Sequence, residues 1–236
     1  MTNKYALYTE DGSSLDRGLL MTAFPENNFP GEEVNYETIP GREGSLVVHT
    51  GTYPDWTITL HFEFIVKQVE DYESVFRDHC KWLRNAEHIS FTDAPDLLYR
   101  VKKVDILDIV RDEDVVGDFT CMFTVWPGTY LADGMKEQSF DGTRVVNQYD
   151  FCKPIYKIVG EGECELSVND VSMVANVGQN LTIDTELMLA YRTDGTLMNT
   201  SVSGDYEDLW LQEGENTVTI TNGFTLTVIP RWRYLA

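Results

Sequence analysis

The sequence lacks the patterns that mark common enzymes, metal sites and membrane spans. It has no apolar run near the roughly 18 residues of a spanning helix, and no GxSxG, HExxH or phosphate-binding GK[ST] loop. Its four histidines show no metal-ligand spacing. We therefore expect a protein that is not an enzyme, with no catalytic residue, no metal, no cofactor and no membrane insertion.

Positive charge is scarce. The chain has 18 lysines and arginines against 39 aspartates and glutamates, a formal net charge of −21. Such a field repels nucleic acid and anionic membranes, which disfavours sequence-specific binding of DNA or RNA. The first residues also lack the apolar centre of a secretory signal, so we expect a protein made and folded in a cytoplasm.

Paired cysteine motifs are absent as well. Cys80, Cys121, Cys152 and Cys164 form no CxxC pair and have no regular spacing. In a reducing compartment cysteine packs as a small hydrophobe. We expect four buried free thiols.

The apolar residues that are present, 42% of the chain, alternate in long stretches. Residues 56–66 and 119–125 follow a period of two, which predicts two half-buried strands. Residues 99–110 predict a third strand. Its apolar parity shifts between Val101 and Val104, and a β-bulge there would explain the shift.

One segment, residues 71–84, follows a helical period instead. Its apolar side chains recur at steps of three and four residues and form one stripe: Val69, Tyr72, Phe76, Cys80 and Leu83. Asp71 is placed to cap the helix N-terminus. The pattern predicts a mainly β protein with one α-helix lying on a sheet.

The apolar pattern fades between Gly128 and Asp150, and we place a domain boundary there. The expected domains are residues 1–135 and residues 136–236. The second half consists of strand and turn signals, which predicts a small antiparallel β-sandwich.

Two hairpins are predicted in the second half from parity. The first has the two-residue turn Asn169-Asp170, of type I′. In residues 217–228 a two-residue loop would place threonine in the core. We therefore predict the three-residue loop 221–223, with Gly223 at a positive φ.

The stretch YETIPGREGSL, residues 36–46, has an arginine between two glycines and a proline. Pro40 and Gly41 suit the centre of a type II turn, and Gly44 permits a second reversal. The simplest interpretation is a structured loop. The functional alternative is a subunit interface formed by Pro40, Gly41, Arg42 and Gly44, because an arginine on a stiff loop of an acidic protein suits an ion pair with a neighbouring subunit.

Several stretches together resemble the distal tail proteins of long, non-contractile-tailed bacteriophages. They are IPGREGSLVV, WTITLHFEF, CKWLRN and ISFTDAPDLLYRVKKV in the first half, and PIYKIVGEGECELSVND, GENTVTITNG and VIPRWRYL in the second. The matches keep their order over nearly the whole chain. GREG with IPRWR is a fairly specific combination.

The resemblance implies a structural virion protein of the tail tip. Its N-terminal belt domain would close a homohexameric ring around the DNA channel, as one ring or as two stacked rings, and its C-terminal domain would be a galectin-like β-sandwich. The implied partners are the major tail protein, the tail-associated tip protein and, in some relatives, a receptor-binding protein. DNA would pass through the lumen without sequence-specific binding, and assembly would take place in the host bacterial cytoplasm.

Two alternatives stay open. A carbohydrate-binding module or receptor-binding tail component would use exposed aromatics such as Trp210 or Tyr206, although the sugar motifs of galectins are absent. A glycosidase needs only two placed carboxylates, and no pair is identifiable from the sequence. Trp232, between Arg231 and Arg233, is expected to pack in the sandwich core.

Overall fold

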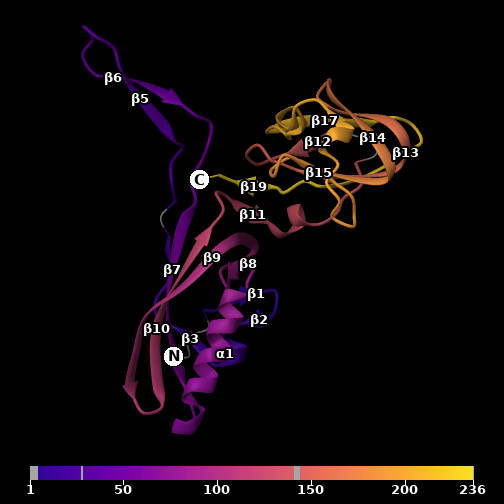
Figure 1. The fold of residues 1–236 in the computed structure, drawn as a ribbon. Coiled ribbons are helices and arrows are strands. Elements are labelled where there is room, and N and C mark those ends of the chain that lie inside the picture. The colour runs from indigo at the N-terminus through magenta and orange to yellow at the C-terminus, as the bar shows by residue number, and fades with distance from the viewer. Residues whose placement is uncertain (1–4, 28, 141–143, 236) are drawn as a thin grey trace. The chain divides into compact units, whose positions relative to one another are not determined.

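The computed structural model describes residues 5–27, 29–140 and 144–235 (Figure 1). Its contacts divide the chain into two compact units. Unit 1 is residues 1–129 with 235–236, and unit 2 is residues 130–234. None of the helices in the described ranges could span a lipid bilayer. The assignment of a ring-forming domain to residues 1–135 and of a galectin-like domain to residues 136–236 stays a prediction.

Unit 1 contains one α-helix among its described residues, and its strands form one large sheet and one hairpin. The elements are β1 (Leu7–Thr9), β2 (Gly12–Ser13), β3 (Leu19–Met21), β4 (Glu26–Asn27), β5 (Val34–Thr38), β6 (Ser45–His49), β7 (Trp56–Ile65), α1 (Tyr72–Arg84), β8 (His88–Phe91), β9 (Ala94–Glu113) and β10 (Val116–Val125). The large sheet has the order β2-β1-β8-β9-β10-β7-β3, with β4 also on β7. The predicted fold class, mainly β with one helix, is confirmed.

The alternation along β7 and β10 is confirmed. The inward residues of both strands are buried and pair across the sheet, as in Phe62 with Phe119 and Ile58 with Phe123. On the other side of β10, Thr124 pairs with Lys103 and Val125 pairs with Val101. One residue of β9 is therefore extra at this point, and the predicted bulge is confirmed.

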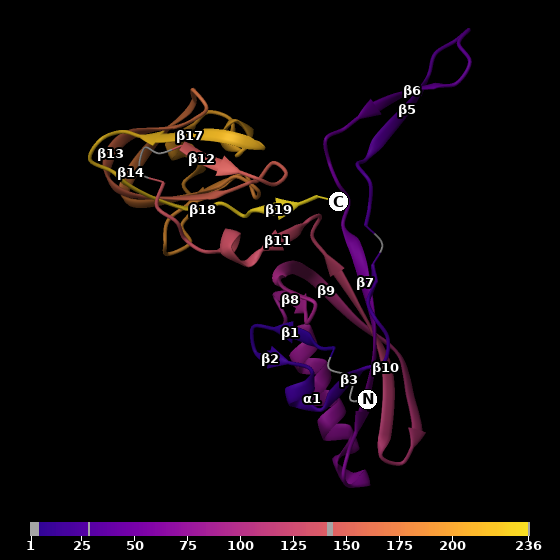
Figure 2. The ribbon, with the colours of Figure 1, turned by 180° about the vertical axis from the view of Figure 1, so that it is seen from behind.

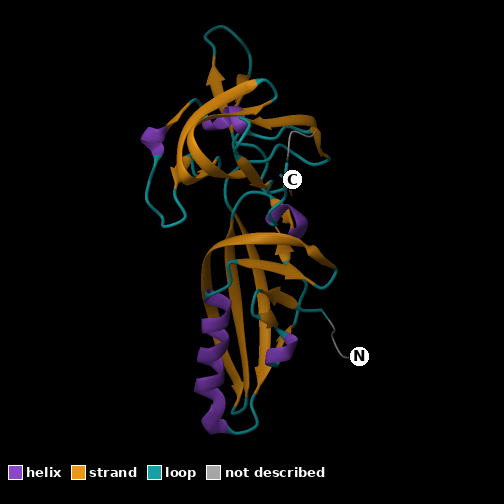
Figure 3. Ribbon diagram, turned by 90° about the vertical axis from the view of Figure 1, so that its right-hand side faces the viewer, coloured by secondary structure: helices purple, strands orange, loops and turns teal. Residues whose placement is uncertain are grey.

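Helix α1 covers one face of this sheet (Figure 3). The Phe64 ring of β7 lies 5.2 Å from that of Tyr72 and 6.0 Å from that of Phe76, between ring centroids. The buried stripe also includes His79 and Trp82, which the period did not single out.

Two details of the helix prediction are wrong. A 3₁₀ turn, Val69–Asp71, precedes the helix, so the chain enters α1 already coiled. Asp71 consequently has helical backbone angles and makes no side-chain cap, because a capping side chain normally needs an extended backbone. Val69 lies in that turn and is 45% exposed.

The second half of the chain has nine further strands in the described residues. They are β11 (Thr129–Leu131), β12 (Arg144–Asn147), β13 (Ile155–Val168), β14 (Val171–Asp184), β15 (Leu189–Tyr191), β16 (Val202–Ser203), β17 (Gly214–Ile220), β18 (Thr225–Ile229) and β19 (Arg233–Tyr234). The main sheet has the order β12-β17-β13-β14-β15, with β16 on β14 and β18 on β13.

The long β13–β14 hairpin bends on itself (Figure 1). At the bend Gly160 pairs with Gln179, and both Gly162 and Gln179 have positive φ values, 101° and 71°. Either side of the bend, the buried side chains of β13 keep the same parity, as Ile158 and Leu166 show. The sheet therefore encloses its core with one continuous face.

The turn between β13 and β14 is as predicted. Val168 pairs with Val171, and Asn169 and Asp170 both have left-handed backbones, with φ values of 51° and 68°. The two central residues of a type I′ turn require such values.

The predicted hairpin in residues 217–228 is wrong. β17 and β18 do not pair with each other; both pair with β13, on either side of its bend. Parity fixes which side chains face inward but not which strand is the neighbour, and β13 is long enough to take both. Gly223 does have a positive φ, 95°, in the turn that connects β17 to β18.

The turn gives a stability prediction. Asp170→Gly removes the steric cost of a left-handed non-glycine residue and is expected to raise the free energy of unfolding by about 0.5–1 kcal/mol. The matched control is Asn169→Gly. The Asn169 side chain accepts from the Thr217 N–H at 2.9 Å and donates to Asn216 Oδ1 at 2.9 Å, so this change is expected to destabilise. Urea unfolding of both variants checks the pair, and a lower midpoint for Asp170→Gly would contradict the turn geometry.

Candidate assembly surfaces

The predicted interface residues lie at the tip of the β5–β6 hairpin, residues 34–49, which we call the arm. The Arg42 N–H donates to the Ile39 carbonyl at 3.1 Å, and Gly41 has φ 80°. The turn predicted at Pro40-Gly41 is therefore confirmed. Gly44 has φ 76° and makes the second reversal, directly before β6. The structure thus brings all four residues together, but their role in an interface stays a prediction.

The arm has no covering layer in the described part of the chain. β5 and β6 pair only with each other, and Figure 2 shows them apart from the other strands of unit 1. Residues 35–50 are all exposed. A lone two-stranded hairpin is marginally stable in water at best. The arm is therefore a surface that gains stability when something binds it.

Apolar side chains occur on both faces of the arm. Paired residues share a face, so Tyr36 and Val47 lie on one side, and Leu46 and Val48 lie on the other with Glu37. Tyr36 is 68% exposed. Exposed apolar clusters of this kind mark interaction sites.

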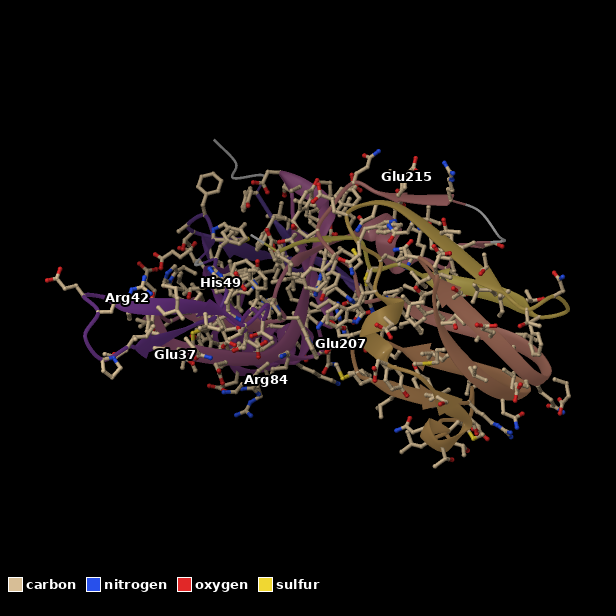
Figure 4. The ribbon with its side chains drawn as sticks, turned by 90° about the horizontal axis from the view of Figure 1, so that it is seen from above. Glu37, Arg42, His49, Arg84, Glu207 and Glu215 are labelled. Atoms are coloured by element: carbon tan, nitrogen blue, oxygen red, sulfur yellow. The ribbon has the colours of Figure 1, made fainter. Side chains whose placement is uncertain are left out.

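The base of the arm is fixed by hydrogen bonds. Glu32 lies 2.8 Å from His49 Nδ1 and accepts from the Gly51 N–H at 2.9 Å, and the hydrogen bond with His49 is the main cause that lowers the pKa of Glu32. A lowered carboxyl pKa means that the bonds are made at neutral pH and are lost as the pH falls through the folded-state value. Figure 4 labels Glu37, Arg42 and His49 on the arm.

A second surface of unit 1 is a groove of about 500 Å³ between α1 and β9. We call it the helix groove. Its lining combines apolar and charged residues: Glu73, Phe76, Arg77, Cys80, Lys81, Arg84, Asn85, Ile106 and Ile109. No local sequence pattern predicts this groove. The signal that the sequence offers is the spacing of three basic residues, Arg77, Lys81 and Arg84, which places them on one side of a helix.

In unit 2 the unexpected feature is a buried ion cluster at the predicted core tryptophan. Trp232 is only half-buried, whereas Arg231 beside it is 5% exposed. The Arg231 guanidinium donates to both Asp184 oxygens, at 2.8 and 2.9 Å, and its Nη1 lies 3.4 Å from Glu186. Tyr130 donates to Glu186 at 3.2 Å. Trp232 packs against the unit 2 core while staying partly exposed, and Arg231 beside it is the more deeply buried residue.

The aromatic residues considered for sugar binding are not exposed. Trp210 is half-buried, stacks on Phe151 at 5.4 Å between centroids, and has the Lys153 ammonium 4.4 Å from its ring centre. Tyr206 is half-buried and packs against the unit 2 core. Their ring faces are thus already partly used within the fold.

The cysteines are buried free thiols, as predicted. Burial raises the pKa of both Cys152 and Cys164 to about 11. A thiolate nucleophile at neutral pH is therefore disfavoured at these positions. Among the described residues, no group of three or more His, Cys, Asp and Glu side chains is placed to hold a metal ion.

Comparisons with known proteins find one matching family model in the first unit and several solved structures with a similar fold. The sequence profile of the phage tail protein RIFT-related domain matches residues 12–125. The crystal structure of the SPP1 Dit protein, described as a paradigm of the hub adsorption apparatus in phages infecting Gram-positive bacteria, is similar with a TM-score of 0.66 and 13% identity, covering 95% of this chain and 97% of that one.

Two structures of the phage p2 baseplate in its activated conformation, with calcium and with strontium, are also similar. Their TM-scores are 0.52 and 0.51, each at 9% identity over 95% of this chain. At such identities the likeness concerns the fold. No curated protein matched the sequence.

Proposed function

We propose that this chain is a structural hub component at the distal tip of a long, non-contractile phage tail. Residues 12–125 match the sequence profile of the phage tail protein RIFT-related domain, which supports this role. The chain is not an enzyme in this proposal. Its unit 1 forms a homohexameric ring around the DNA channel, single or stacked in pairs. The observation that carries the proposal is the likeness to a hub protein over 95% of the chain, because it includes both units.

The proposed ring has several partners. On one side it contacts the major tail protein, and on the other the tail-associated tip protein. A receptor-binding protein is a further candidate. The arm supports an assembly role, since its exposed apolar side chains have no partner layer within the described residues. The half-buried state of Trp210 and Tyr206 gives no support to a sugar-binding platform.

The proposed function also offers a physical reason for the net charge of −21. Acidic side chains on the lumen wall would repel DNA and let it pass without sticking. A charge map of the assembled ring checks this, and a basic or neutral lumen would contradict it.

The location is tested on virions. Antibodies raised against the purified chain, carried on gold particles, are expected to label the end of the tail distal to the head. Label along the tube, on the head, or nowhere on intact and mildly disrupted particles would overturn the tail-tip assignment.

Arg42 gives a mutational prediction. Arg42→Glu is expected to weaken ring formation roughly tenfold, because Arg42 at the exposed arm tip is placed to form an ion pair with a carboxylate of the neighbouring subunit. The melting temperature of the chain is expected to stay unchanged, because the arm tip is exposed. Sedimentation at a series of concentrations measures the effect. The matched control is Arg144→Glu, at an exposed arginine of unit 2, which is expected to assemble as the unmodified chain does. Equal assembly of both variants would remove Arg42 from the interface.

A further inference from the structure

We propose that the helix groove of unit 1 receives the arm of a second copy of this chain. This inference rests on the proposed ring, and it assigns the two surfaces that meet in the ring. It commits to one side of the arm, the face that carries Glu37, Leu46 and Val48.

The groove is suited to an apolar side chain. The apolar part of its lining comes from Phe76 and Cys80 of α1 and from Ile106 and Ile109 of β9. A second irregularity of β9 explains why two residues three apart line one groove. Leu107 and Val110 of β9 pair with Thr120 and Asp118 of β10, so β9 has one residue more than β10 between these two pairs. Asp108 lies in this bulge with φ 49°, and the alternation of side chains along β9 changes there. Ile109 is 54% exposed.

The rim of the groove is positive in a strongly acidic protein. Arg77, Lys81 and Arg84 follow one side of α1, and Figure 4 shows Arg84 on the outside of unit 1. Arg77 pairs with Glu73 at 3.4 Å. Lys81 and Arg84 make no ion pair with any described residue, so two cations at the rim are available to a partner.

The arm has the opposite character. Arg42 is the only lysine or arginine between Glu26 and Asp55. Glu37 and Glu43 form no ion pair within the described ranges, whereas Glu32 is used at the arm base. Unpaired carboxylates on an apolar hairpin thus match unpaired cations around an apolar groove, which is the complementarity that selects one partner surface over others.

The two surfaces are different patches of the same chain. Contact between them is therefore heterologous, with each copy giving its arm to one neighbour and its groove to the other. Such contacts close into a ring when the rotation between copies permits it.

The test reverses the charges on each side. The groove variant is Lys81→Glu with Arg84→Glu, and the arm variant is Glu37→Lys with Glu43→Lys. Each alone is expected to assemble roughly tenfold or more weakly than the unmodified chain, because like charges then face each other. An equimolar mixture is expected to recover assembly, because a basic arm then meets an acidic groove and an acidic arm meets a basic groove. Light scattering gives the mass in each case.

The controls separate the possible failures. Since acidic residues in the last turn of α1 oppose the helix dipole, Lys81→Gln with Arg84→Gln is measured beside the groove variant, with thermal unfolding of both. If the unmodified chain assembles and the variants assemble equally well, the arm–groove contact is overturned and the ring stands. If the mixture does not recover, the pairing of these two surfaces is overturned. If the unmodified chain stays a single copy, both the ring and the contact fail.

Discussion

Arg231→Met is expected to lower the stability of unit 2 by about 3–5 kcal/mol, the largest single-residue effect that we expect in this protein. The substitution removes the guanidinium that pairs with the buried carboxylates of Asp184 and Glu186. It also removes the hydrogen bond from Arg231 to the Lys153 carbonyl, which is 3.2 Å long. Removing one member of a buried ion cluster lowers the free energy of unfolding by more than the intact cluster adds to it, because uncompensated charge stays in a region of low polarity.

Chemical denaturation with a probe in unit 2, such as fluorescence of Trp210 or Trp232, measures the effect. Arg144→Met is the matched control. Arg144 also pairs with a carboxylate, Glu215 at 3.4 Å, but both side chains are exposed, so the loss is expected to stay below about 1 kcal/mol. Similar losses for the two arginines would mean that Arg231 is not held in the buried cluster.

Removing the arm is expected to abolish assembly while leaving the fold intact. Val34 pairs with His49 across the arm, so residues 35–48 are replaceable by a two-residue Asn-Gly turn. The bonds at the base of the arm, from Glu32 to His49 and Gly51, are kept. No arm residue belongs to the core of unit 1, so the melting temperature is expected to stay within a few degrees. Light scattering is expected to give the mass of one chain.

A partial deletion separates the tip from the strands. Replacing Ile39–Gly44 by Asn-Gly removes Arg42 but keeps most of the arm strands, including Leu46 and Val48. This variant is expected to assemble more weakly than the unmodified chain but better than the variant without the arm. A chain without the arm that still reaches the full assembled mass would exclude the arm from the interface.

Parts of the fold were predictable because they depend on neighbours in sequence. A strand with one buried face must alternate apolar and polar residues, so the sequence pattern predicts both β7 and β10 and the residues of each that face inward. The type I′ turn at Asn169-Asp170 follows from the same parity, since the loop length decides which residues face each other. The apolar stripe of α1 was visible, although the preceding 3₁₀ turn and its effect on Asp71 were not.

Other features depend on partners far along the chain. Parity could not reveal that β17 and β18 both pair with β13, because either arrangement buries the same side chains. Arg231 meets Asp184 across 47 positions, a separation that no local pattern encodes. Residues 45–49 have the composition of a buried strand, so the exposure of the arm was also not predictable. The basic residues of α1 have the spacing of an ordinary solvent-exposed helix face. Only the position of β9 beside them, which the sequence does not reveal, makes them part of a groove.

In the proposed function, copies of this chain close into a ring. Negative-stain images of the purified protein, taken from the same fraction as a light-scattering mass, test it most directly. We expect particles with a central hole and a mass of six or twelve chains. A uniform population of single chains over the whole concentration range, with no ring in any image class, would contradict it.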